Sequence, residues 1–160
     1  MTRWIENISR DDIRNGHHTD MGPNAMLIQI ADPAQGFPTP KYQFKEVHQF
    51  EFLDLEDRHE YMSEFRCTPE QGAELARLLK HALENNMNVL VHCHAGICRS
   101  GAVVAVGETL GFTSTGRWKL PNLLVKRLML DALGMDYTAQ QEEYDRIFNQ
   151  NKCLGWTEFE

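Results

Sequence analysis

The residues with the clearest chemical potential are a cysteine and an arginine separated by five positions, Cys93 and Arg99, with Ser100 directly after them. The segment lies between a short apolar run, Asn88–His92, and an apolar stretch that continues to Leu110. These flanks predict a strand, a turn and a helix. A turn that leads into a helix directs several backbone N–H groups at one point, where the helix dipole is also positive. The sequence therefore predicts an anion site at this turn.

The side chains at this turn suit phosphate chemistry. The planar guanidinium of Arg99 can bind two oxygens of a tetrahedral oxyanion at once, which a lysine cannot do. The positive field of the turn favours the thiolate form of Cys93. A thiolate that faces a bound phosphate ester is a nucleophile aligned for in-line attack.

The string His92-Cys93-His94-Ala95-Gly96-Ile97-Cys98-Arg99-Ser100 resembles the His-Cys-x5-Arg-Ser signature of cysteine-dependent protein tyrosine phosphatases. The position of this motif in the chain and the length of the chain are similar to those of the small dual-specificity branch of the family. The resemblance is sharp over about 90–110, looser over about 25–110, and weak or absent after 115. It implies that Cys93 is the nucleophile and forms a phosphocysteine, and that Ser100 assists its departure. It also implies that His92 orients the loop and that the phosphoryl oxygens are bound by the Arg99 side chain and the main chain of His94, Ala95, Gly96, Ile97, Cys98 and Arg99.

The same family requires a general acid on an upstream loop to protonate the leaving oxygen. Phe52-Leu53-Asp54 resembles the phenylalanine–x–aspartate found at a strand end in several small members, which favours Asp54. Asp54 precedes Cys93 by 39 residues (93 − 54), which is longer than is usual in this branch. An insertion over Glu56–Cys67 would account for the excess, and it keeps Asp57 as the second choice.

Cys98 has two readings. The pair Cys93 and Cys98, in Cys-x4-Cys spacing, resembles the loop of the low-molecular-weight tyrosine phosphatases, although those enzymes place the loop near the N-terminus. Cys98 is therefore either a redox partner of Cys93 or a residue that simply packs under the loop, and both interpretations stay open.

A metal site is not expected. His92, Cys93, His94 and Cys98 lie within seven residues, too close together to surround one ion easily, whereas zinc sites pair two separated groups of ligands. No cofactor is expected either.

The pattern of elements favours an α/β fold. Strands are expected at Trp4–Ile8, Ala25–Ile30, Val47–Leu55 and Asn88–His92, and helices after Ser9, from Thr68 to about Asn85, over Ser100–Leu110, from Pro121 to Leu133, and from Thr138 to about Gln150. We therefore expect one domain over 1–160, with a central, mostly parallel sheet of four or five strands flanked by helices and a helical part from about 115. The resemblance implies the same phosphatase-like fold.

The net charge and the number of cysteines argue against several classes of function. The 160 residues carry a net charge of −7, which argues against a nucleic-acid-coating surface. Four cysteines are too few for a secreted disulfide scaffold, and the first residues lack the apolar core of a signal peptide, so a cytoplasmic protein with no membrane association is expected. The resulting hypothesis is a protein tyrosine or dual-specificity phosphatase that acts on a phosphorylated protein. An RNA 5′-triphosphatase, a phosphoinositide phosphatase and a non-catalytic phosphate-binding module stay open as alternatives. The sequence does not indicate an oligomeric state.

Overall fold

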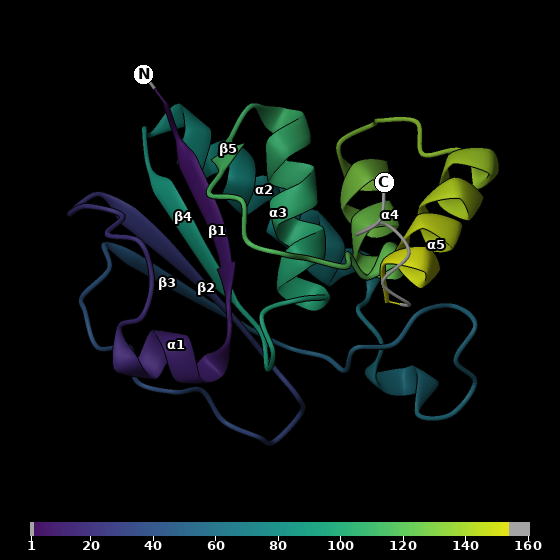
Figure 1. Ribbon diagram of the computed structural model, residues 1–160, viewed down its shortest axis with the longest axis horizontal. Coiled ribbons are helices and arrows are strands. Elements are labelled where there is room, and N and C mark those ends of the chain that lie inside the picture. The colour runs from purple at the N-terminus through teal and green to yellow at the C-terminus, as the bar shows by residue number, and fades with distance from the viewer. Residues whose placement is uncertain (1, 154–160) are drawn as a thin grey trace.

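The protein forms a five-stranded parallel sheet in the order β3-β2-β4-β1-β5, with helices packed on it (Figure 1). The computed structural model describes residues 2–153. This architecture confirms the predicted α/β class and the parallel central sheet. The elements are β1 (Trp4–Ile8), α1 (Arg10–Asn15), β2 (Ala25–Ala31), β3 (Glu46–Glu51), a short 3-10 helix (Ser63–Phe65), α2 (Pro69–Glu84), β4 (Asn88–His92), α3 (Arg99–Leu110), β5 (Thr113–Ser114), α4 (Leu123–Ala132) and α5 (Ala139–Cys153).

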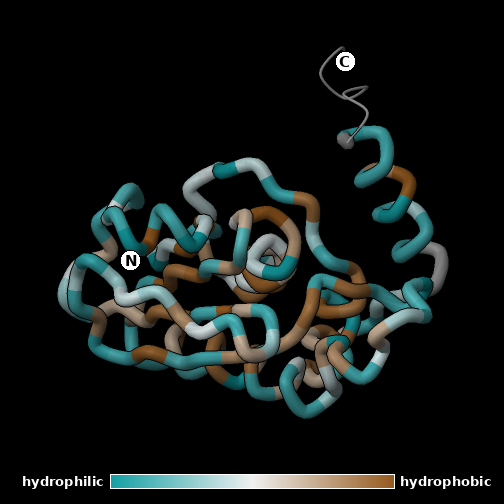
Figure 2. Tube along the Cα trace, turned by 90° about the horizontal axis from the view of Figure 1, so that it is seen from below, coloured by the Kyte–Doolittle hydropathy of each residue, from teal (hydrophilic) through white to brown (hydrophobic). Residues whose placement is uncertain are grey.

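Both faces of the sheet are covered, which explains why the middle of β4 is apolar at consecutive positions. In β4, Val89 and Val91 belong to a large core cluster that includes residues of α2, α3 and α4. Leu90 points to the opposite face and joins a smaller cluster with Ile13 of α1. Because side chains alternate along a strand, a strand buried on both faces needs apolar residues at consecutive positions. Figure 2 shows the hydrophobic residues gathered in the body of the fold and the more hydrophilic α5 at its periphery.

Side-chain caps determine where helices α1 and α2 begin. The Ser9 side chain accepts a hydrogen bond from the backbone N–H of Asp12, and this bond caps α1. Thr68 and Gln71 form the reciprocal capping box expected at the start of α2. Gly72 then lets α2 approach α4 closely, since a Cβ atom at this position would lie 2.6 Å from the Cβ of Leu128.

The structure corrects two predicted boundaries and adds one strand. The third strand ends at Glu51 rather than Leu55, because Leu53 N–H leaves the sheet and bonds Phe65 O instead. Helix α4 begins at Leu123 rather than Pro121, because the side chain of Asn122 caps it through the N–H of Val125. The two-residue strand β5 was not predicted, since so short a segment has no periodicity to recognise.

Because all strands run the same way, their carboxyl ends lie at one edge of the sheet. The segments that follow β1, β2, β3 and β4 therefore meet at that edge. This is the edge where parallel α/β sheets bind their ligands. Among residues 2–153, no helix has the length and apolar character needed to cross a membrane.

Candidate active site

The turn between β4 and α3, residues 93–99, is named the phosphate loop after the anion site that the sequence predicts there. Its backbone carbonyls bond outward to the surrounding chain. Arg10 N–H donates to His94 O at 3.2 Å, and Leu120 N–H donates to Ile97 O at 3.1 Å. The side-chain amide of Asn7 donates to Gly96 O at 2.7 Å. In a planar trans peptide the N–H points opposite to the C=O, so the following N–H groups face the hollow of the loop. The loop thus directs amides inward, as the sequence predicts for an anion site.

Gly96 allows this loop to sit close to the end of β1. Its φ of +75° is a left-handed conformation that glycine adopts without strain. A Cβ atom here would lie 2.3 Å from the carbonyl carbon of Ile8 and 2.6 Å from Ser9 N. Only glycine fits, because the obstructing atoms belong to the backbone.

Cys93 and Ser100 lie together at the base of the loop. The Sγ of Cys93 is 3.1 Å from the Oγ of Ser100, and both residues are buried. This hydroxyl is therefore in position to donate a hydrogen bond to a thiolate on Cys93. The structure thus brings together the predicted nucleophile and the serine expected to assist it.

His92 lies behind the loop and is fully buried. Its Nδ1 donates to the carbonyl of Cys93 at 3.3 Å. Burial lowers the pKa of His92 to about 4; the hydrogen bond to Cys93 O opposes the shift, and the positive charges of Arg10 and Arg99 add to it. His92 is therefore a neutral imidazole near pH 7 that bonds the backbone at the start of the loop.

Two acceptors hold the guanidinium of Arg99. Its Nη1 donates to the carboxylate of Asp32 at 2.7 Å and to Phe52 O at 2.8 Å. The guanidinium is almost completely buried, and its Nε finds no hydrogen-bond partner in the part of the chain that the structure describes. A buried guanidinium N–H normally has an acceptor. An oxyanion in the loop would supply one.

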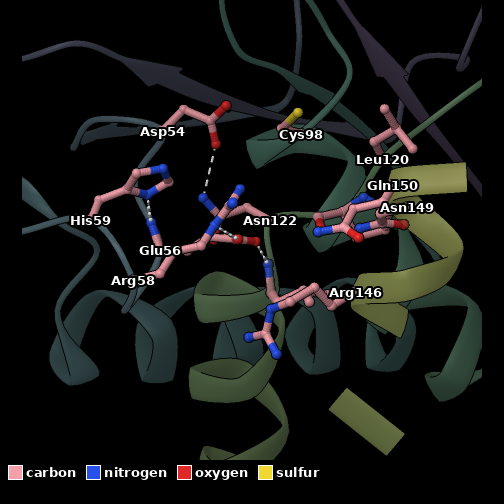
Figure 3. A pocket seen from close by; sticks show the side chains of 12 residues that line it. Asp54, Glu56, Arg58, His59, Cys98, Leu120, Asn122, Arg146, Asn149 and Gln150 are labelled. Carbon is pink, nitrogen blue, oxygen red and sulfur yellow. Dashed lines mark hydrogen bonds and ion pairs between the residues drawn. The ribbon is translucent and has the colours of Figure 1, made fainter. Parts of the chain in front are cut away.

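The two candidate acids have different surroundings. The Oδ1 of Asp54 accepts a hydrogen bond from the Asn122 side chain at 2.8 Å, and Asp54 lines a cavity of about 420 Å³ together with Cys98 (Figure 3). Asp57 instead forms ion pairs with Arg127 and Arg66 and lines a different cavity. The hydrogen bond from Arg127 lowers the pKa of Asp57 despite the opposing effect of partial burial. Asp57 is therefore held as a carboxylate.

The cavity beside Asp54 is bounded by the phosphate loop, the acidic segment after β3, the start of α4, and α5. Figure 3 shows Asp54 and Cys98 on one side of this cavity, with Arg146 and Asn149 of α5 across from them. Cys98 is the N-cap residue of α3 and is partly exposed. Among the described residues, no three His, Cys, Asp or Glu side chains are grouped so that they could hold a metal ion.

Sequence reasoning missed two residues that contact the predicted site. Asp32 was assigned no role, although its place after β2, next to β4, puts it at the edge of the sheet where parallel α/β sheets bind ligands. Asn122 was overlooked because Pro121 was taken as the helix start. Asparagine is among the strongest N-cap residues, and that preference could have identified it.

Comparison with known proteins agrees with the motif. Residues 43–108, less than half of the chain, match the model of the Tc-R-P family, described as "Polymorphic toxin system, DSP-PTPase phosphatase". The match confirms the resemblance that the His92–Ser100 motif predicts, to cysteine-dependent phosphatases of the dual-specificity branch. No curated protein sequence matched the chain.

Solved phosphatase structures are also similar to the chain. The Orf virus tyrosine phosphatase OH1 shares 16% identity at a TM-score of 0.48, over 94% of this chain and 70% of that one. A human tyrosine phosphatase-like serine/threonine/tyrosine-interacting protein shares 20% identity at 0.42, over 78% of each chain. Human DUSP28 shares 10% identity at 0.45, over 95% of this chain and 94% of that one.

Proposed function

We propose that this protein is a phosphomonoester hydrolase that acts through a phosphocysteine on Cys93, as a protein tyrosine or dual-specificity phosphatase. The observation that carries the proposal is the buried Nε of Arg99, which has no acceptor among residues 2–153 and lies beside a loop whose carbonyls bond outward. Guanidinium and inward amides together provide a binding site for a dianionic phosphoryl group. The match to a phosphatase family model supports the same class.

The proposed reaction has two steps. In the first, the Cys93 thiolate attacks phosphorus, while Asp54 donates a proton to the leaving oxygen. Asp54 is preferred to Asp57 because it lines the cavity that reaches the phosphate loop, whereas Asp57 is engaged by two arginines. In the second step, water attacks the phosphocysteine, and the Ser100 hydroxyl stabilises the departing thiolate from 3.1 Å away.

The proposed substrate is a phosphorylated protein, and a reducing compartment such as the cytoplasm would keep the Cys93 thiol active. No loop position between His94 and Cys98 is a lysine. Lysines inside the loop are common in phosphoinositide phosphatases, so this absence disfavours that alternative. The net charge of −7 disfavours an RNA substrate.

The proposal is tested by phosphate release from p-nitrophenyl phosphate in the presence of EDTA. The unaltered protein should turn over, whereas Cys93→Ser should be inactive but still bind inorganic phosphate, because Arg99 and the loop amides are retained. Arg99→Lys should be severely impaired, since an ammonium cannot replace the guanidinium fork. Phosphate binding by the unaltered protein without turnover would identify a binding module instead of an enzyme.

A further inference from the structure

Asn122 connects the two loops that the proposed reaction must align. Its backbone N–H donates to Cys98 O of the phosphate loop at 2.9 Å. Its side-chain Nδ2 donates to Asp54 Oδ1 at 2.8 Å and to Leu55 O at 3.1 Å in the acidic segment. One residue therefore contacts both the segment that bears the proposed acid and the loop that bears the proposed nucleophile.

The orientation of the Asn122 amide is fixed by its surroundings. The side-chain Oδ1 accepts the N–H of Val125 and so caps α4, which leaves the NH₂ group directed at two acceptors, Asp54 and Leu55 O. Only 2% of Asn122 is exposed. A buried amide with its hydrogen bonds satisfied holds one geometry, because any rotation would leave polar groups unpaired.

This contact also distinguishes the two oxygens of Asp54. An amide N–H is only a donor, so Oδ1 must present a lone pair to Asn122. In the protonated carboxyl the hydrogen then lies on Oδ2, the other oxygen. A general acid must present its proton to the leaving oxygen within hydrogen-bond reach.

We propose that Asn122 is a positioning residue for the general acid: it holds the Asp54 carboxyl against the phosphate loop and places its proton on Oδ2. This inference rests on the proposed function. Asn122 does not touch the reacting atoms, and its effect should pass entirely through Asp54. Its removal should therefore matter only when the leaving oxygen needs a proton.

The test compares a poor leaving group with a good one, phenyl phosphate with p-nitrophenyl phosphate. Asn122→Asp and Asn122→Ser both retain a side-chain oxygen that can cap α4 but lose the amide donor. Either should lower kcat/KM for phenyl phosphate on the order of 10- to 100-fold, while p-nitrophenyl phosphate changes by less than about 3-fold. In an Asp54→Asn background, the same substitutions should cause no further loss on phenyl phosphate.

A pH profile gives a readout that a purely structural role would not move. Asn122→Asp places a second carboxyl beside Asp54, and two adjacent carboxyls retain one proton to higher pH. The basic limb of kcat/KM should therefore shift upward in Asn122→Asp but not in Asn122→Ser. If burial of the new carboxyl prevents Asn122→Asp from folding, the leaving-group comparison with Asn122→Ser decides alone.

Asn88→Ser is the matched control, because Asn88 makes a similar pair of side-chain bonds at the opposite end of β4. It should leave the ratio of the two substrates unchanged. Equal losses on both substrates, or an additional loss in the Asp54→Asn background, would overturn the role of Asn122 while leaving the phosphatase proposal intact. Absence of turnover by the unaltered protein on either substrate would overturn both.

Discussion

The carboxylate of Asp32 accepts a hydrogen bond from Arg99 at 2.7 Å, although 67 residues separate them in the chain. Phe52 O accepts a hydrogen bond from the same nitrogen, so both N–H groups of Nη1 have acceptors. Nε and Nη2 form the other edge of the guanidinium, which is the edge left to bind an oxyanion. The ion pair thus orients the fork rather than merely balancing its charge.

Substitution of Asp32 should therefore weaken oxyanion binding. Hydrogen bonds to charged groups contribute about 1.5–3 kcal/mol, and the half-exposed position of Asp32 favours the lower end. Asp32→Ala should lower kcat/KM about 10-fold and raise the inhibition constant for inorganic phosphate. Asp32→Asn keeps an acceptor and should lose less. Glu74→Ala, which removes an exposed ion pair with Arg77 on α2, is the control. Unchanged phosphate inhibition in Asp32→Ala would contradict the orienting role.

The assignment of the acid makes a second prediction. Asp54→Asn should lower kcat/KM about 10²–10⁴-fold for phosphotyrosine, and much less for an activated aryl phosphate whose leaving oxygen needs no proton. The acidic limb of the pH–rate profile should persist, while the basic limb flattens. Asp57→Asn should show neither change, since Asp57 is paired with Arg127 away from the cavity. If Asp57→Asn alone shows this pattern, the assignment is wrong.

The difference between what could and could not be predicted follows the range of the interactions. The phosphate loop and the caps at Ser9 and Thr68 depend on residues a few positions apart, so their signals lie within a short stretch of sequence. The choice between Asp54 and Asp57, in contrast, depends on residues that are distant in the sequence. Both lie in one irregular segment, and their directions are set by Asn122 and Arg127, 68 and 70 residues away.

His92 makes a prediction about stability. Its pKa is about 4 in the folded protein, against an ordinary value of 6.5 that applies once the chain unfolds. As the pH falls below about 6.5 the unfolded chain binds the proton first, so the free energy of unfolding falls until the pH reaches about 4. Between pH 7 and pH 5 this loss should be about 2 kcal/mol.

Urea unfolding at the two pH values, with His92→Asn for comparison, isolates this contribution. Asparagine can still donate to the Cys93 carbonyl but does not titrate in this range. The variant should lose about 2 kcal/mol less stability than the unaltered protein on going from pH 7 to pH 5. His17→Asn, at an exposed position, should behave like the unaltered protein. Parallel pH dependence in His92→Asn and the unaltered protein would show that the buried imidazole is not the cause.

The last prediction concerns oxidation of Cys93, the proposed nucleophile. A thiolate on Cys93 should react with peroxide to give a sulfenic acid. Cys98 lies five positions on, across a curled loop, and it lines the cavity beside Asp54 (Figure 3). A curled loop can bring the two Cβ atoms toward the roughly 3.5–4.5 Å that a disulfide requires. The Cys98 sulfur would then attack the sulfenic sulfur, form the disulfide and release water.

Mild peroxide should therefore inhibit the proposed phosphatase activity, dithiothreitol should restore it, and peptide mapping should find Cys93 joined to Cys98. Cys98→Ser should stay active but recover much less after oxidation, because the sulfenic acid then proceeds to irreversible forms. Cys67→Ala is the matched control, since burial raises the pKa of Cys67 to about 12 and keeps its thiol protonated. Its recovery should equal that of the unaltered protein. If Cys98→Ser also recovers fully, Cys98 does not protect the nucleophile and is a packing residue only.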